Sequence, residues 1–193
     1  MFHTFRGGRL VFILVVVIAM LWPAAYAGAF TPVHEPSAQE AWPPVPALVE
    51  NINVSTAPSN PTELIAAGDA LFFVADDGIH GSDLWITDGT GTGTRMVWDF
   101  QPGASWSMPM HLTAIGSVVY FAGYDAVYGE ELWISDGTIS GTRVIKDINV
   151  GPSGSAPRGL VAVGDTLFFY AGDDAHGYEL WTSDGTATGT RLV

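Results

Sequence analysis

The stretch Asp83-Leu-Trp-Ile-Thr-Asp-Gly-Thr90 decides the fold of this chain, because its pattern occurs three times. It returns as Glu131-Leu-Trp-Ile-Ser-Asp-Gly-Thr138 and as Glu179-Leu-Trp-Thr-Ser-Asp-Gly-Thr186, so the copies are spaced by 48 residues. In every copy two further residues and then Gly-Thr-Arg follow. Such self-similarity at a fixed period predicts a repeat protein in which each copy is one supersecondary unit.

The repeat extends outward from this motif over most of the chain. The copies span residues 61–108, 109–156 and 157–193, and a partial copy at 48–60 precedes them, so that the repeat domain is 48–193. Three sets of identical columns are interpreted as structural: the tryptophans Trp85, Trp133 and Trp181, the aspartates Asp88, Asp136 and Asp184, and the arginines Arg95, Arg143 and Arg191.

Each copy is predicted to form four short strands. In the first copy these strands are centred on residues 64–66, 70–75, 83–87 and 95–98. The 70–75 segment is apolar at successive positions, which is typical of a strand buried on both faces. The Asp88-Gly-Thr-Gly-Thr-Gly93 stretch suits a hairpin turn, since Asp accepts backbone hydrogen bonds and Gly supplies positive φ. The sequence therefore predicts an all-β fold of three four-stranded repeats.

Two architectures fit three such repeats. Four strands in 48 residues suit a blade of a partial β-propeller, which we favour, while a closed threefold barrel of the β-trefoil kind is the alternative. Leu48-Val49 and Leu192-Val193 are three periods apart, so both pairs lie at the same phase of the fourth strand. We therefore expect either further repeats from a longer chain or self-association.

The three motifs resemble the ELWxxDGT repeat proteins of bacteria. The resemblance covers nearly all of the chain after residue 47, and the first copy departs from it only by Asp83 in place of Glu. It implies a secreted or cell-surface protein of several β repeats, usually more than three. It implies no activity, because the family is defined by its repeat.

The N-terminal residues predict export. Arg6 and Arg9 precede the apolar run Leu10–Trp22, and Ala25-Tyr-Ala27 offers a cleavage site, so residues 1–27 are predicted to be a signal peptide. An uncleaved anchor is the alternative, although the run is shorter than a spanning helix needs. Residues 28–47 are rich in proline and are predicted to be a linker. The expected location is extracytoplasmic, with no membrane contact after cleavage.

Composition excludes several classes of function. A net charge of −13 repels a phosphate backbone, so nucleic acid is not an expected partner. The absence of cysteine excludes disulfides, thiol catalysis and zinc ribbons. No HExxH, GxSxG or phosphate-loop motif occurs, and we predict no catalytic residues and no bound cofactor.

Acids recur in three sets, at 77/125/173, 88/136/184 and 99/147, and Asp77, Asp125 and Asp173 are the candidates for a metal site. Oxygen ligands in glycine-rich turns can hold Ca²⁺, but the spacing of a known calcium loop is absent. We expect each Asp to cap the backbone of its own turn, and calcium binding is the alternative.

The other repeated side chains are expected to serve structure. The arginine column is predicted to form ion pairs with repeated acids, with ligand contact as the alternative. The tryptophan column is predicted to lie in the core, with an exposed row that stacks on sugars as the alternative. His80 and His176 share a column with Tyr128, which indicates a surface position, and His111 is isolated.

These patterns favour an exported, non-enzymatic repeat module that presents a rigid β surface for binding an extracellular protein or polysaccharide. A fragment of a carbohydrate-active hydrolase or lyase is one alternative. The other alternative is an acidic structural component of a surface or matrix, with itself or calcium as its partner.

Overall fold

The computed structural model describes residues 47–100 and 109–193. The predicted signal peptide, 1–27, and all but the last residue of the predicted linker, 28–47, lie outside the described residues. Within the described part of the chain, no helix is long and apolar enough to cross a membrane.

The described residues form three antiparallel sheets of four strands each, and they contain no helix. In every sheet the strands lie side by side in chain order, so each repeat is an up-and-down meander. Sheet A consists of β1 (Thr62–Ala67), β2 (Ala70–Asp76), β3 (Ser82–Thr87) and β4 (Arg95–Trp98). Sheet B consists of β5 (Met110–Ile115), β6 (Val118–Asp125), β7 (Gly129–Ser135) and β8 (Arg143–Lys146). Sheet C consists of β9 (Arg158–Val163), β10 (Thr166–Asp173), β11 (Gly177–Ser183) and β12 (Arg191–Leu192).

The register of the central hairpin is the same in the three sheets. Phe73 pairs with Trp85, Phe121 with Trp133 and Phe169 with Trp181. The predicted strands of the first copy match β1 to β4 closely, and the predicted burial of 70–75 is confirmed for Phe72 to Ala75, whereas Ala70 and Leu71 are half-buried. The all-β prediction and the four strands per repeat are therefore confirmed.

The first strand of each sheet carries an irregularity at one repeat column. Its pairing with the second strand shifts register in all three sheets. Glu63, His111 and Gly159 occupy the same column there, with φ of 55°, 63° and 62°. Only the third copy has the residue that adopts this backbone without a steric cost.

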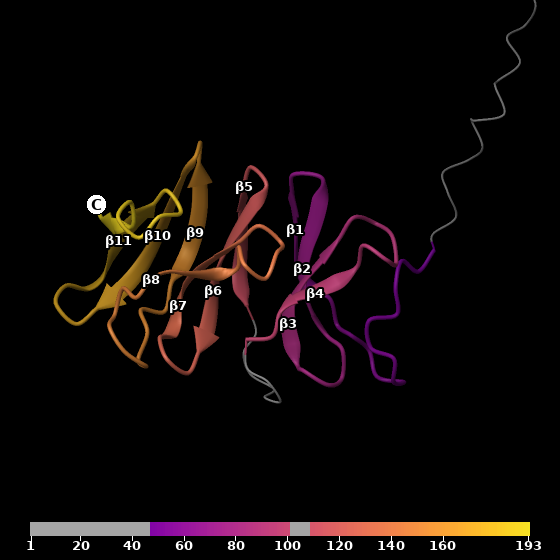
Figure 1. Ribbon diagram of the computed structural model, residues 1–193. Coiled ribbons are helices and arrows are strands. Elements are labelled where there is room, and N and C mark those ends of the chain that lie inside the picture. The colour runs from indigo at the N-terminus through magenta and orange to yellow at the C-terminus, as the bar shows by residue number, and fades with distance from the viewer. Residues whose placement is uncertain (1–46, 101–108) are drawn as a thin grey trace, which may run out of the picture. The chain divides into compact units, whose positions relative to one another are not determined.

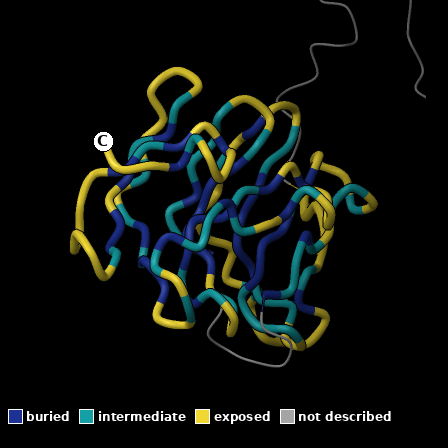
Figure 2. Tube along the Cα trace, turned by 60° about the vertical axis from the view of Figure 1, so that its left-hand side comes forward, coloured by how far each residue is buried: buried dark blue, intermediate teal, exposed yellow. Residues whose placement is uncertain are grey.

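Successive sheets pack face to face, and the core lies between them. We call the side of a sheet that is turned toward the next repeat its tail face, and the opposite side its head face. Between sheets A and B, tail-face residues such as Val74 and Leu84 pack on the head-face residues Phe121 and Trp133. An equivalent cluster joins sheets B and C, built around Leu132, Phe169, Trp181 and others. Figure 1 shows the three sheets following one another, and Figure 2 shows buried segments inside and exposed ones in the turns.

The strands of the described residues close no barrel. Each sheet ends in two separate edge strands, which is contrary to the trefoil-like alternative. That alternative would need strands from different repeats to pair around one axis, whereas here strands pair only within a repeat and the cores between repeats are formed by side chains on sheet faces.

Candidate functional site

The Asp-Gly-Thr turns between the third and fourth strands are closed by their own side chains. In the first copy Asp88 accepts hydrogen bonds from the Thr90 backbone N–H at 2.9 Å and from the Thr90 hydroxyl at 2.7 Å. The same two bonds recur at Asp136 and at Asp184. Hydrogen bonds from these threonines hold the pKa of all three aspartates below its ordinary value. The predicted hairpin turn is confirmed, and its carboxylates are engaged within it.

A glycine is required opposite each of these aspartates. A Cβ atom at Gly93, Gly141 or Gly189 would overlap the carboxylate of Asp88, Asp136 or Asp184 respectively. The first glycine of the turn is needed for another reason, since Gly89, Gly137 and Gly185 adopt φ between 85° and 89°. The repeated Asp and Gly residues of the motif therefore specify the same turn geometry in all three copies.

The arginine column connects each sheet to the next one. Nη2 of Arg95 donates to the carbonyl oxygen of Gly137 at 2.8 Å, and Nη2 of Arg143 donates to that of Gly185 at 3.0 Å. The predicted partner was an acid, and that prediction is wrong, because both acceptors are backbone carbonyls of the next Asp-Gly-Thr turn. The side chains of the Asp-Gly-Thr turn bind one another and the turn's own N–H groups, so the first glycine's carbonyl accepts the arginine of the preceding repeat. Arg191, the third member, lies exposed on β12.

The calcium candidates Asp77, Asp125 and Asp173 cap the turns between the second and third strands. Oδ1 of Asp77 accepts the backbone N–H of Ile79 and His80, both at 2.8 Å. Asp125 and Asp173 bind their own turns in the same way. The expected capping role is confirmed. In the described part of the chain no three His, Asp or Glu side chains gather where they could hold a metal ion.

Two of these turns carry a histidine on the aspartate. Nδ1 of His80 lies 2.7 Å from Oδ2 of Asp77, and Nδ1 of His176 lies 2.9 Å from Oδ2 of Asp173. The hydrogen bond to Asp77 raises the pKa of His80. Burial raises the pKa of Asp77, but hydrogen bonds from the His80 backbone, its ring and the Ile79 backbone outweigh it, so the pKa is lowered. Both histidines are substantially exposed, which fits a surface column.

The tryptophan column lies in the core, as predicted. Trp85, Trp133 and Trp181 are all buried, so the alternative of an exposed row for sugar stacking is wrong. Nε1 of Trp85 donates to the carbonyl of Ala75 at 3.1 Å, and Trp181 donates to Ala171 at 3.2 Å. The indole groups of Trp85 and Trp181 therefore hold together the central hairpin of their own sheets, whereas Nε1 of Trp133 is buried without a hydrogen bond.

Glu131 is a buried acid that sequence reasoning missed. Its side chain is 0% exposed, and its carboxylate accepts the Asn149 N–H at 3.0 Å and the Ser155 hydroxyl at 2.6 Å. Burial raises the pKa of Glu131 to about 7, against the lowering effect of these hydrogen bonds. The group holds the connection between sheets B and C onto sheet B. A comparison of the Asp83, Glu131 and Glu179 column could have signalled it, since an acid recurs there inside an apolar strand.

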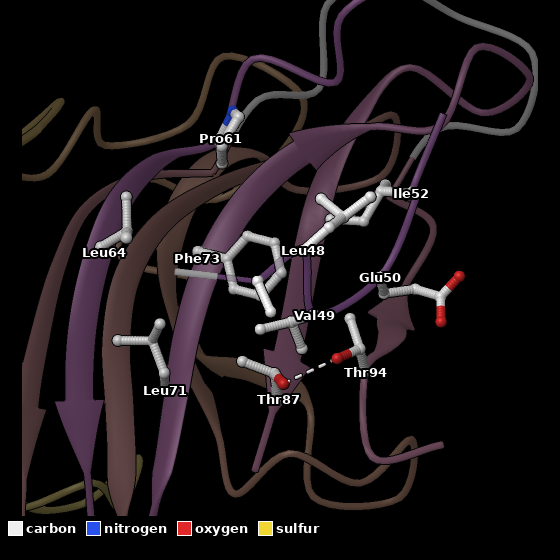
Figure 3. A pocket seen from close by; sticks show the side chains of 11 residues that line it. Leu48, Val49, Glu50, Ile52, Pro61, Leu64, Leu71, Phe73, Thr87 and Thr94 are labelled. Carbon is white, nitrogen blue, oxygen red and sulfur yellow. Dashed lines mark hydrogen bonds between the residues drawn. The ribbon is translucent and has the colours of Figure 1, made fainter. Parts of the chain in front are cut away.

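An apolar hollow of about 250 Å³ lies on the head face of sheet A. The segment from Leu48 to Ile52 passes over this face beside Phe73, with Leu64 and Leu71 along the rim (Figure 3). Ile52 packs on Phe73 and Trp85 and covers part of the face. Leu64 remains 58% exposed, whereas its counterpart Leu112 in sheet B is 9% exposed. The head face of the first repeat is therefore only partly covered.

A smaller polar hollow of about 170 Å³ lies at sheet C, beside the turn of Asp173. Asp173, Asp174, Asn149 and Tyr178 line it, so carboxylates, an amide and an exposed aromatic ring face one space. Hydrogen-bonding groups next to an aromatic ring are what a sugar ligand requires.

Comparison with known proteins adds little to this geometry. No family model matches the chain, and no curated protein matches it. A solved prolyl endopeptidase is 13% identical with a TM-score of 0.46, over 68% of this chain and 19% of that one. The computationally designed Ika8 protein is 14% identical with a TM-score of 0.40, over 67% of this chain and 35% of that one. This chain thus spans about a fifth and about a third of their lengths, and a likeness this distant supports no inference about its function.

Proposed function

We propose that this chain is an exported, non-enzymatic repeat module that binds an extracellular partner through a rigid β surface. The observation that carries the proposal is the tail face of sheet C. Val161, Val163, Tyr170 and Leu180 are exposed there, although the corresponding faces of sheets A and B are covered by the next sheet. A contiguous apolar face on an ordered sheet is the usual mark of an interaction surface.

The repeat geometry supports a surface role rather than catalysis. The repeated carboxylates of the turns are hydrogen-bonded to their own backbone, and the arginines of the first two copies bind carbonyls of the neighbouring repeat. An active site needs a cluster of polar groups aimed at one bond, and repeated structural columns do not provide it. On this proposal the three sheets are successive blades of a partial β-propeller, and residues 1–27 direct export.

The polar hollow beside Asp173 supports a polysaccharide as a second class of ligand. Tyr178 would stack on a sugar ring while Asp173 and Asn149 accept and donate hydrogen bonds. The net charge of −13 favours a neutral polysaccharide over an acidic one.

The test asks whether the chain binds a polysaccharide without cleaving it. The full chain is immobilised and exposed to a panel of neutral polysaccharides, and both bound material and released reducing sugar are measured. The proposal expects bound material with no release, and Tyr178→Ala should abolish the retention. Release of sugar that disappears on changing a single acidic residue would refute a non-enzymatic role and favour the hydrolase or lyase alternative.

A further inference from the structure

We propose that the partner of the exposed tail face of sheet C is the head face of sheet A in a second copy of this chain. The inference rests on the proposed function, because it names the partner of that same surface. Copies associate head to tail and rebuild the contact that sheet A makes with sheet B and that sheet B makes with sheet C. The contacts between sheets A and B and between sheets B and C serve as the template for the proposed contact between copies.

Apolar residues of the template are exposed on the first and the last sheet, although Phe73 and Trp85 of sheet A are already buried. Leu84 and Leu132 on the tail faces of sheets A and B are 0% exposed, while Leu180 in the same column is 49% exposed. On the head faces, Leu112 is buried and Leu64 is exposed. Sheet A and sheet C therefore each show half of an interface of this kind, and the two halves are complementary.

The column of Asp83, Glu131 and Glu179 extends this match to polar groups. Glu131 on sheet B binds the Asn149 backbone and the Ser155 hydroxyl of the connection that follows it. Glu179 is the equivalent residue of sheet C, and it lies exposed. Two periods before Asn149 and Ser155, the segment that precedes sheet A carries Asn53 and Ser59.

The segment that precedes sheet A already holds the position of a connection between repeats. The Asp76 N–H donates to the Ser59 carbonyl at 2.9 Å, and the Gly172 N–H donates to the Ser155 carbonyl at the same distance. Ile52 packs on Phe73 and Trp85. Its counterpart Ile148 packs in the cluster of Phe169 and Trp181. These two contacts place Ser59 and Ile52 on sheet A as Ser155 and Ile148 are placed on sheet C, so the Ser59 side chain is in position for the carboxylate of a preceding sheet.

The arginine column gives a third, separate match. Arg95 and Arg143 each donate to a glycine carbonyl 42 residues later. For Arg191 the corresponding glycine is Gly89 of the next copy. Space is left for it, because an added Cβ at Gly89 would meet nothing within 4 Å, whereas at Gly137 it would meet Ile86 of the preceding sheet.

One short segment must give way in this assembly. Leu48 and Val49 stand three periods before Leu192 and Val193, so the two pairs would claim the same position on the docked faces. Leu48 is 80% exposed and loses little burial when it moves aside. Asn53, Ser59 and the rest of the connection keep their places on sheet A.

The contact is heterologous, which makes it testable by complementation. Leu180→Glu places a charge on the tail face, and Leu64→Glu places one on the head face; both side chains are exposed, so an unchanged thermal melt of the dilute chain checks the fold. Sedimentation velocity of the full chain at rising concentration should show dimers and longer chains of copies. Each variant alone should remain monomeric, with a dissociation constant raised at least about 100-fold. An equimolar mixture of the two should form a dimer and nothing larger, because one intact head face and one intact tail face remain.

A milder variant tests the polar match. Ser59→Ala removes the hydroxyl that would bind Glu179, and it should weaken association about tenfold while the chain's own fold is kept. A wild-type chain that is monomeric at every concentration overturns the second-copy proposal, and the retention experiment then decides the proposed function separately. Association of Leu64→Glu equal to that of wild type overturns it too, because tail faces would be pairing with one another.

Discussion

Glu131 links pH to the stability of the repeat domain in a direction opposite to that of an ordinary acid. Its pKa is about 7 in the folded chain because burial disfavours the carboxylate, and about 4.5 is the ordinary value that applies when the chain unfolds. The folded state therefore holds this proton more tightly than the unfolded state does. The contribution to stability is fully present below about pH 4.5 and is lost as the pH rises through about 7.

The size of this effect follows from the two pKa values. The difference between them corresponds to about 3 kcal/mol of unfolding free energy. In Glu131→Gln the side chain stays neutral, so this loss cannot occur. The free energy of unfolding of the variant, minus that of the wild type, should therefore rise by up to about 3 kcal/mol between about pH 4 and pH 8.

Urea unfolding of both proteins at a series of pH values measures this difference and cancels the titration of the other acids. Ser155→Ala is the companion variant, because it removes a hydroxyl that donates to the ionised carboxylate at 2.6 Å. The free energy of unfolding that Ser155→Ala loses relative to the wild type should be larger at high pH than at low pH. A difference between Glu131→Gln and wild type that stays flat from pH 4 to pH 8 would refute the reasoning.

Four further outcomes follow from the turns and the contacts between sheets. Arg143→Met should lower the unfolding free energy by about 2 kcal/mol because it removes the charged donor to Gly185, while Arg191→Met should cost less in the dilute chain; paired urea titrations compare them. Gly141→Ala should destabilise because its Cβ overlaps the Asp136 carboxylate, and a double-mutant cycle with Asp136→Ala should show a cost that shrinks in the second background. His111→Gly should raise the melting temperature, with a gain of up to about 1 kcal/mol, because His111 adopts a φ of 63°, and an unchanged or lower melting temperature would contradict this. Chelation with EDTA should leave the melting temperature unchanged, since the repeated aspartates bind backbone N–H groups; a drop that added Ca²⁺ reverses would revive the calcium alternative.

The strands could be predicted from the sequence because their signals are local. The apolar run from Leu71 to Ala75 and the turn at Asp88 specify a hairpin through neighbouring residues alone, and the period of 48 residues copies it. Burial of the tryptophans followed from the same pattern. Local propensity and repetition agree here, and such agreement allows the fold to be predicted from the sequence.

The contacts between repeats could not be predicted in the same way. Arg95 reaches a carbonyl of the next sheet rather than an acid, and nothing in a column of arginines reveals a backbone acceptor. Glu131 belongs to a column of acids, but its burial depends on the connection that folds over it. The positive φ of Glu63 and His111 was hidden by their side chains, and only Gly159 in the third copy hinted at it. These features arise from packing between sheets, which a strand pattern does not encode.

The hydrogen bond from each arginine to the next Asp-Gly-Thr turn has a consequence for how such a chain can change length. The bond from Arg95 to Gly137 and the bond from Arg143 to Gly185 join equivalent atoms across equivalent distances in the sequence. Loss of a stretch of 48 residues, such as 110–157, would bring Arg95 to the turn of Gly185 and restore the same bond. Duplication of that stretch would add one more link of the same kind. A gene that encodes this repeat can therefore gain or lose whole units by recombination while the arginine bond between neighbouring units is kept.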